Sequence, residues 1–183
     1  MSDIAMNWID GQAIQPGDTS PNPKEKFMSG TAVDTVTGLL QNLGNPEVVQ
    51  RLVAADAVYV SLNYDNPELA QILPWAGTHH GPSSFTDALG MMFTWWANEQ
   101  FDATDIVGDD DRAAVFGTFR YRSHTLDKVV TSPFAILIRV SNGLITYLQF
   151  MEDTYATAAS FRSAGSWTVH GDPSGQPIEV PSR

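Results

Sequence analysis

The sequence predicts a single α+β domain in which a curved antiparallel sheet wraps around N-terminal helices and forms a cone with an internal pocket. Helical periodicity is confined to the first half of the chain, and from about residue 99 the chain has the pattern of consecutive strands joined by short turns. Helices first and strands afterwards is typical of folds in which helices pack on one face of a sheet. A length of 183 residues with 43% hydrophobic content favours one core rather than two.

The predicted elements of the first half carry start and stop signals. Apolar residues recur at helical spacing over residues 31–43, and Gly44 then ends that helix. Asn-Pro-Glu occurs at 45–47 and again at 66–68, and it predicts a helix start because Asn caps the helix and Pro suits its first turn. We therefore expect helices at 31–43, 45–56, 66–74 and 82–96, a strand at 58–62 and a loop at 75–81.

The second half has the pattern of an antiparallel meander. Residues of high β propensity predict strands at 99–107, 112–123, 129–140 and 144–152. Asn142-Gly143 predicts a tight hairpin between the last two, because a type I′ turn needs positive φ at both central residues. A helix at 154–162 and a short terminal hairpin within 167–180 complete the expected elements.

We divide the chain into three parts. Residues 1–28 are polar and interrupted by prolines, so we expect an N-terminal arm there rather than a domain. Residues 29–165 hold the predicted helices and the meander, and they form the expected cone domain. Residues 166–183 form a C-terminal tail with the predicted hairpin.

The composition argues against several classes of partner. A formal charge of −11 should repel nucleic-acid phosphates and anionic lipid headgroups, so we expect no nucleic-acid or membrane partner. Apolar runs are far too short to span a bilayer and no N-terminal targeting pattern is apparent, so we expect a cytoplasmic protein. The lack of cysteine removes disulfides, thiol nucleophiles and thiolate metal sites.

The meander ends in the segment 147–153, which reads Tyr-Leu-Gln-Phe-Met-Glu-Asp. Together with the order of elements before it, this segment resembles the nuclear transport factor 2-like superfamily, and within it the branch of SnoaL-like polyketide cyclases and ketosteroid isomerases. The resemblance covers about residues 33–165. It implies a cone with a deep mouth between helices and sheet, and commonly a homodimer through the outer face of the sheet. Fold alone does not assign function, because the superfamily includes enzymes, transport factors and pocket proteins.

Asp153 is the expected catalytic residue, because the resemblance places an acid/base aspartate late in the last strand. The cyclases have a pocket-facing aromatic residue four positions earlier, where this sequence has Gln149. Gln149, Met151 and Asp153 share one strand face, so we expect all three at the cavity. A buried carboxylate there would have a raised pKa and would take a proton from a carbon next to a carbonyl. The competing interpretation is that Asp153 caps the following helix, with Glu152 in solvent or at an interface.

Two related chemistries lack residues that they need. Ketosteroid isomerases use a strand-borne aspartate as base, and Ser61 stands at that position here. Limonene epoxide hydrolases place an arginine between two aspartates, whereas the strand with Arg120 and Arg122 contains no aspartate. Steroid isomerisation and epoxide hydrolysis by those mechanisms are therefore disfavoured.

We expect large apolar side chains to line the pocket, with a few polar groups that orient a ligand. His79 and His80 lie near the expected mouth, but adjacent side chains diverge and no third ligand is spaced to join them, so we expect no metal site. No phosphate-binding loop is present, so we expect no cofactor. The expected pocket residues are Tyr59, Ser61, Trp75, His79, His80, Phe85, Met92, Trp96, Phe119, Tyr121, Phe134, Ile136, Gln149 and Met151.

Three functions remain open from the sequence. The first is a cofactor-free enzyme, a cyclase or isomerase or else a hydrolase, with Asp153 as proton acceptor on a hydrophobic carbonyl compound. The second is a non-catalytic binder of a small hydrophobic ligand. The third is a dimeric protein-interaction module of the transport-factor type, whose working surface lies outside the cone.

Overall fold

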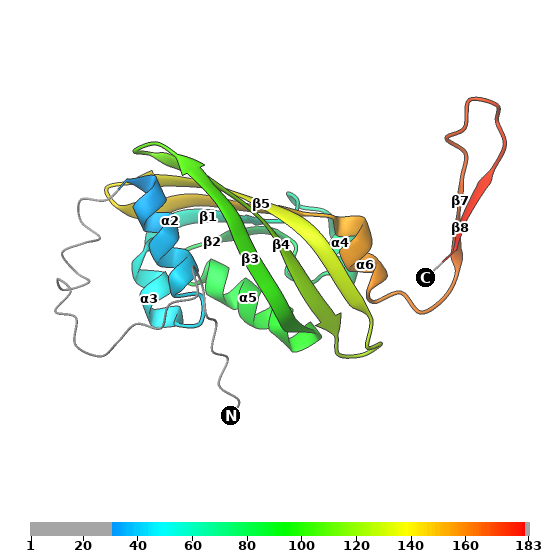
Figure 1. Cartoon of the computed structure of the whole chain (residues 1–183), viewed down its shortest axis with the longest axis horizontal. Helices are drawn as coiled ribbons and strands as arrows, with labels where there is room; N and C mark the ends of the chain where they lie inside the picture. The colour runs from blue at the N-terminus through cyan, green and yellow to red at the C-terminus, as the bar shows by residue number, and fades with distance from the viewer. Residues whose placement is uncertain (1–30, 182–183) are drawn as a thin grey trace.

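The computed structural model of the chain describes residues 31–181, so the arm expected at residues 1–28 lies outside the described residues. A six-stranded sheet forms the body, and it curves around helices α2 (Ala32–Gln41) and α5 (Ser84–Trp95) (Figure 1). The predicted α+β class is confirmed. The cavity described below lies between these two helices and the sheet.

The remaining elements are short helices and the strands of two sheets. The helices are α3 (Pro46–Arg51), α4 (Pro67–Ile72) and α6 (Thr154–Ala159). The strands of the main sheet are β1 (Val53–Ser61), β2 (Gly77–His80), β3 (Trp96–Gly108), β4 (Arg112–Ser123), β5 (Val129–Ser141) and β6 (Leu144–Glu152). The second sheet is the pair β7 (Ser166–Val169) and β8 (Ile178–Pro181).

Side-chain caps explain where the first helices begin. Thr31 and Asp34 form a capping box at the start of α2, because the Thr31 hydroxyl accepts from Asp34 N and the Asp34 carboxylate accepts from Thr31 N. Asn45 and Asn66 cap α3 and α4, each accepting a hydrogen bond from the backbone NH three residues later. The helix starts predicted from the two Asn-Pro-Glu triplets are confirmed.

The order of strands across the main sheet is β2-β1-β6-β5-β4-β3. The meander from β3 to β6 is antiparallel throughout, as predicted. Asn142 and Gly143 have φ values of 52° and 74°, which confirms the tight hairpin between β5 and β6. One pair departs from the antiparallel pattern, because β1 runs parallel to β6.

Two short segments differ from the sequence-based expectation. Residues 53–56 were expected in a helix, yet they begin β1, where Val53 pairs with Ile145 of β6. The expected loop at 75–81 contains β2, which pairs antiparallel with the end of β1. A strand of four residues is too short to show a period in the sequence, so only its pairing with β1 defines it.

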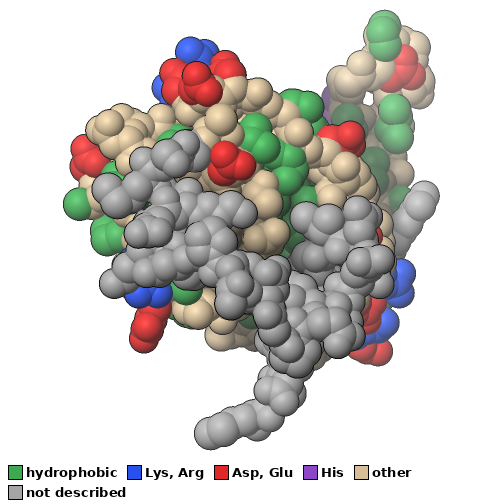
Figure 2. Space-filling view, turned by 60° about the vertical axis from the view of Figure 1, so that its left-hand side comes forward, with side chains coloured by type: hydrophobic (Ala, Val, Ile, Leu, Met, Phe, Trp, Pro, Cys, Tyr) green, Lys and Arg blue, Asp and Glu red, His purple; other side chains and the backbone are tan. Residues whose placement is uncertain are grey.

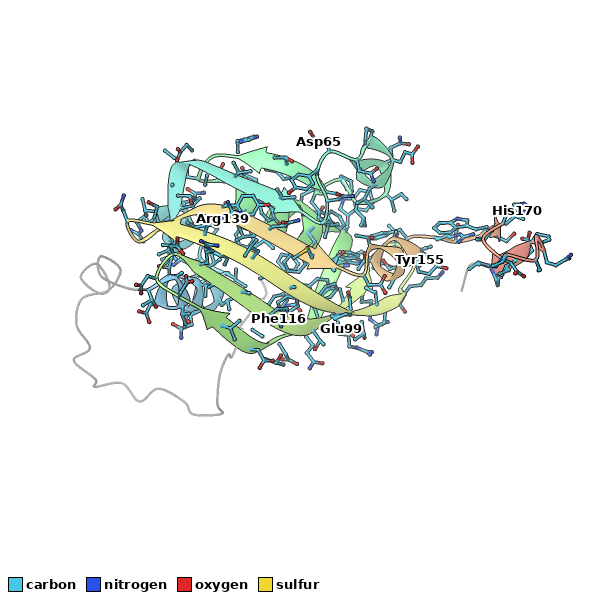
Figure 3. All side chains as sticks on the ribbon, turned by 90° about the horizontal axis from the view of Figure 1, so that it is seen from above. Asp65, Glu99, Phe116, Arg139, Tyr155 and His170 are labelled. Atoms are coloured by element: carbon cyan, nitrogen blue, oxygen red, sulfur yellow. The ribbon has the colours of Figure 1, made fainter. Side chains whose placement is uncertain are left out.

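The main sheet has one buried and one exposed face. Val115, Ile136 and Leu148 face the helices and are at most 3% exposed. On the opposite face Phe116 is 45% exposed and Met151 39%. Figure 3 shows Phe116 with Arg139 on this outer face. The homodimer implied by the resemblance would use this face and stays a prediction.

The strands β7 and β8 form an antiparallel hairpin that extends away from the body (Figure 1). Trp167 on β7 is 51% exposed, and its ring meets that of Tyr155 on α6 at a centroid distance of 5.3 Å. Acidic side chains lie at several separate places on the face drawn in Figure 2, so the negative charge does not gather in one patch there. Within residues 31–181, none of the helices has the length and apolar character needed to cross a membrane.

Gly117 on β4 is a position where the sheet admits no side chain. A Cβ atom there would lie 2.0 Å from the backbone oxygen of Asp102 and 2.6 Å from the ring of Phe134. Phe134 is 4% exposed and stacks on Phe101 at 4.4 Å, so its ring has little room to move. The glycine lets this ring lie flat across the sheet beneath the cavity.

We therefore predict that Gly117→Ala lowers the free energy of unfolding by about 3 kcal/mol, because overpacking forces the sheet and the Phe134 ring apart. Urea unfolding followed by circular dichroism measures the change. Gly90→Ala is the matched control, since a Cβ at Gly90 in α5 meets no atom within 4 Å and alanine is the better helix former. Equal stability of the two variants would contradict the prediction.

Candidate functional site

A mostly apolar cavity lies between α2, α5 and the inner face of the main sheet. Its free volume is about 40 Å³, enough for a few water molecules, so a larger ligand requires side chains to move. Leu43, Leu89 and Phe93 line it and remain partly exposed, which marks where the cavity approaches the surface. The lining residues are Leu39, Leu40, Leu43, Tyr59, Ser61, Leu62, Trp75, Phe85, Ala88, Leu89, Met92, Phe93, Asn98, Phe101, Tyr121, Ile136, Phe150 and Glu152.

Five polar side chains from four strands interrupt this apolar wall. Tyr59 and Ser61 come from β1, Asn98 from β3, Tyr121 from β4 and Glu152 from the end of β6. Among the described lining residues there is no lysine, arginine or histidine. The cavity therefore holds a carboxyl group without a cation to balance it.

The Glu152 carboxyl is only partly satisfied. The side chain as a whole is half-buried, but its Oε1 is shielded from solvent and has no hydrogen-bond partner among the described residues. Burial raises the pKa of Glu152 to about 8; the nearby Asp153 charge adds to the rise and a side-chain hydrogen bond with Thr157 opposes it. At neutral pH the carboxyl is therefore mostly protonated, and it exchanges its proton close to physiological pH.

Two buried phenols lie near this carboxyl. Burial raises the pKa of both Tyr59 and Tyr121 well above the ordinary value, and the charge of Glu152 raises both further. A side-chain hydrogen bond with Ser61 acts in the opposite direction on Tyr59. Both tyrosines thus keep their protons at any physiological pH, and they act as hydrogen-bond donors.

A β-bulge in β3 turns Asn98 toward the cavity. Asn98 pairs with Tyr121 and Gln100 pairs with Arg120, so Glu99 is an extra residue on β3. Because of this extra residue, Asn98 and Phe101 both line the cavity although they are three positions apart. The Asn98 Oδ1 atom is shielded from solvent and has no hydrogen-bond partner within residues 31–181.

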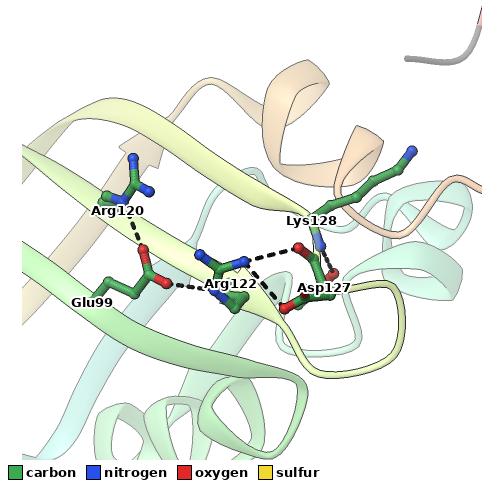
Figure 4. Close-up of polar contacts among 6 residues, drawn as sticks. Glu99, Arg120, Arg122, Asp127 and Lys128 are labelled. Carbon is green, nitrogen blue, oxygen red and sulfur yellow. Dashed lines mark hydrogen bonds and ion pairs between the residues drawn. The ribbon is translucent and has the colours of Figure 1, made fainter.

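The bulge is held from the outer face by ion pairs (Figure 4). The Glu99 carboxylate accepts from Arg120 Nε at 2.6 Å and from Arg122 Nε at 2.5 Å. Hydrogen bonds from these two guanidinium groups hold the pKa of Glu99 below its ordinary value. Arg122 also contacts Asp127 at 3.1 Å, which ties the bulge to the turn between β4 and β5.

A strained turn ends β1 at the cavity. Leu62 has a φ of 66°, a conformation that bulky side chains rarely adopt. Asn63 N donates to Ser61 O at 2.8 Å across Leu62, and Leu62 N donates to Phe150 O at 2.9 Å. The turn places the Leu62 side chain in the cavity wall directly after Ser61.

Comparison with known proteins identifies the family. The model of the SnoaL-like domain matches residues 40–148. The chain is a member of the SnoaL-like family. Patulin biosynthesis cluster protein F of Penicillium expansum is 39% identical over 144 residues, which cover 76% of this chain and 72% of that protein.

Solved structures show the same fold at low sequence identity. An NTF2-like protein from Burkholderia thailandensis E264 superposes with a TM-score of 0.65 at 15% identity, covering 74% of this chain and all of that one. TerC, co-crystallised with polyporic acid, gives a TM-score of 0.58 at 18% identity and covers 68% and 93% of the two chains. The predicted resemblance is confirmed, and the SnoaL-like domain has the NTF2-like fold.

The structure brings about half of the predicted pocket residues of the SnoaL-like domain to the cavity. Trp96, Phe119 and Phe134 are buried in the adjoining core without lining the cavity. His79 lies on β2 outside it, with Nε2 at 2.9 Å from Trp75 O, and His80 is exposed. The predicted residues that line it are Tyr59, Ser61, Trp75, Phe85, Met92, Tyr121 and Ile136.

The expected inner face of β6 is corrected by the register. Phe150 pairs with Ile136 and Glu152 with Phe134, so Phe150 and Glu152 face the cavity. Gln149 and Met151 do not line the cavity, because successive side chains of a strand point to opposite faces.

Asp153 also lies outside the cavity. Its backbone NH donates to Ser132 Oγ at 3.0 Å, and its exposed carboxylate accepts from Ala156 N at 3.0 Å. This is the helix cap that was the competing interpretation.

Several lining residues were not predicted from the sequence. Leu89 and Phe93 share the helical face of Phe85 in α5, and that spacing was a usable signal. Glu152 follows Leu148 and Phe150 at strand spacing, but the opposite face carries Tyr147 and Met151, so the spacing alone did not decide which face lies inside. Asn98 depends on the bulge, which the sequence does not reveal. Within the described residues, no group of three or more His, Asp or Glu side chains is arranged to hold a metal ion.

The raised pKa of Glu152 predicts a pH-dependent loss of stability. Between about pH 4.5 and pH 8 the folded chain holds a proton that the unfolded chain has released, so the free energy of unfolding falls as pH rises through this range. Relative to Glu152→Gln, the wild type should lose roughly 4 kcal/mol between pH 5 and pH 9. Urea unfolding across this range measures the loss.

Glu68→Gln, at an exposed position on α4, is the control. If the free energy of unfolding changes with pH in the same way in the wild type and in Glu152→Gln, the raised pKa of Glu152 is refuted.

The cap at Asp153 gives a separate prediction. Asp153→Ala should lower the free energy of unfolding by about 1 kcal/mol, because Ala156 N loses its acceptor, whereas Asp153→Asn should retain most of the stability, since asparagine also caps helices. Thermal and urea unfolding of the two variants measure the difference. Equal losses in both would show that the charge, rather than the cap, stabilises the helix.

Proposed function

We propose that this SnoaL-like domain binds a small hydrophobic carbonyl compound in the cavity and catalyses a cofactor-free isomerisation or cyclisation, with Glu152 as the proton-transferring residue. The observation that carries the proposal is the carboxyl of Glu152, whose Oε1 is buried without a partner at an apolar cavity and whose pKa is raised to about 8. A group with such a pKa accepts and returns protons near neutral pH.

The chemistry that we propose is proton transfer at a carbon next to a carbonyl. The Glu152 carboxylate takes the proton as the C–H bond breaks, and the electron pair moves to form an enolate with its charge on the carbonyl oxygen. Tyr59 and Tyr121 supply phenolic hydrogen bonds to that oxygen, since both stay protonated. Glu152 then returns the proton to another carbon, or the enolate carbon forms the ring bond at a second electrophilic carbon of the same molecule, whose oxygen takes up the proton.

The wall of the cavity supports an uncharged, mainly apolar ligand. No cationic side chain is available among the described lining residues, and an anion would repel the ionised form of Glu152. Aromatic side chains such as Trp75, Phe85 and Phe101 suit a flat ring.

The relatives support the same class of ligand. The relative from Penicillium expansum is named for patulin biosynthesis, and TerC was co-crystallised with polyporic acid. By this likeness the chain acts on an intermediate in the biosynthesis of a small organic molecule.

Deuterium exchange tests the proposal without the natural substrate. Cyclohexanone in D₂O, followed by proton NMR, should lose its α-protons faster with the protein than with buffer alone. Glu152→Gln should lower the protein-dependent rate at least about 100-fold, because the amide cannot accept the proton. The wild-type rate should rise with pH and level off above about 8, because only the ionised carboxyl is a base.

Asp153→Asn is the matched control, because it removes the neighbouring carboxylate and leaves Glu152 in place. Loss of the Asp153 charge lowers the pKa of Glu152, so the rates are compared on the plateau above about pH 8. An unchanged exchange rate in Glu152→Gln would refute the role of this residue. Binding of the ketone with no exchange above the buffer rate would instead favour the non-catalytic binder.

A further inference from the structure

We infer that the ligand of this cavity is a hydroxy-carbonyl compound, and that Asn98 selects it by accepting a hydrogen bond from its hydroxyl group. The inference rests on the proposed function, since it places the carbonyl end of the ligand near Glu152 and the two tyrosines. It adds a second anchoring point at β3.

The first step is that the buried side-chain carbonyl of Asn98 lacks a hydrogen-bond partner. Asn98 lines the cavity, and its Oδ1 is shielded from solvent and has no hydrogen-bond partner within residues 31–181. Leaving a buried acceptor unpaired costs free energy, and native structures rarely leave one without a reason. A ligand with a donor group would satisfy it. A plain ketone offers only an acceptor, so it would leave Oδ1 unpaired.

The second step is that the sheet is built to keep Asn98 in this place. Asn98 lies on the same inner face as the buried Trp96, and the extra residue Glu99 brings Phe101 to that face as well. The Glu99 carboxylate accepts from Arg120 and Arg122 on the outer face. Without the bulge, alternation would place Asn98 and Phe101 on opposite faces. A hydrophobic side chain at position 98 would be buried in this apolar wall at a lower free-energy cost than the amide of Asn98.

The third step concerns the kind of donor. The cavity contains no lysine, arginine or histidine among its described lining residues. An ammonium donor would form an ion pair with Glu152, but that carboxyl is mostly protonated at neutral pH and offers a cation little charge. A neutral hydroxyl is the donor that fits both ends of the site.

The two ends define an orientation for the ligand. Asn98 pairs with Tyr121 across β3 and β4, while Glu152 lies at the end of β6, two strands beyond β4. The ligand would then span the sheet, with its hydroxyl at Asn98 and its carbonyl oxygen within reach of the phenols. The carbon that loses its proton would face Glu152.

Binding measurements with small ketones test the inference. Cyclohexanone is compared with 3- and 4-hydroxycyclohexanone by ligand-observed NMR titration, so no turnover is needed. The wild type should bind the better hydroxy isomer about tenfold more tightly than cyclohexanone, because only the hydroxyl satisfies Oδ1. Asn98→Leu should abolish this preference while binding cyclohexanone at least as well as the wild type.

The control is Gln100→Leu, which makes the same amide-to-leucine change on β3 outside the cavity and should keep the preference. Asn98→Leu should unfold at an unchanged or higher temperature, since an apolar side chain replaces an amide whose buried oxygen has no partner; this separates lost binding from lost folding. A wild type without preference, an Asn98→Leu variant that keeps it, or no binding of any of the three ketones would overturn the inference.

The experiments distinguish failure of the proposed proton transfer from failure of the inference about the ligand. Glu152→Gln should keep the hydroxyl preference although it loses deuterium exchange, because Asn98 is unchanged. If no exchange occurs but the preference is present in the wild type and absent in Asn98→Leu, the ligand class stands and the catalytic role of Glu152 falls. If exchange occurs without the preference, the catalytic role of Glu152 stands and the ligand class falls.

Discussion

The chemistry available to the cavity depends on the withdrawal of one carboxyl group from water. At the end of β6, Glu152 exchanges hydration for an apolar wall and two phenols, and no cationic side chain among the described lining residues offsets the loss. Burial keeps this carboxyl mostly neutral at neutral pH and leaves its Oε1 without a hydrogen-bond partner among the described residues. The pKa values of Tyr59 and Tyr121 are raised mainly because these side chains are buried themselves, and the nearby charge of Glu152 adds to the rise. In a site of this kind, burial by the protein sets the protonation state of the carboxyl.

The fold supplies that burial through a few local devices. Gly117 lets the Phe134 ring lie against the sheet, where it fills the core beneath the cavity. The bulge at Glu99 directs Asn98 inward, and the strained turn at Leu62 continues the wall beyond the end of β1. The glycine, the bulge and the turn each interrupt the regular pattern of a strand, and all three lie at or beneath the cavity. Departures from ideal geometry are expected at the functional site of a protein.

Sequence reasoning predicted the features that local chemistry determines. The caps at Asn45 and Asn66 and the Asn142-Gly143 hairpin depend on a few adjacent residues, and they are present as predicted. The strand face of Glu152 could not be decided in that way, because β6 carries apolar residues on both sides and only pairing with β5 shows which side is inside. The position of Asn98 at the cavity could not be predicted for a related reason, because a bulge depends on how two strands pair.

The turn at Asn142-Gly143 and a bulge just after it together decide which face of β6 lies inside. Arg139 pairs with Tyr147 and Val140 pairs with Ile145, so Thr146 is an extra residue on β6, and the register that turns Glu152 inward begins only beyond it. Deleting that one residue would exchange the faces of the rest of the strand, bringing an amide and a thioether to the inside and carrying the acid to the outside. Which side chain becomes the buried acid is therefore decided by the length of the strand segment before it, and not by its immediate neighbours.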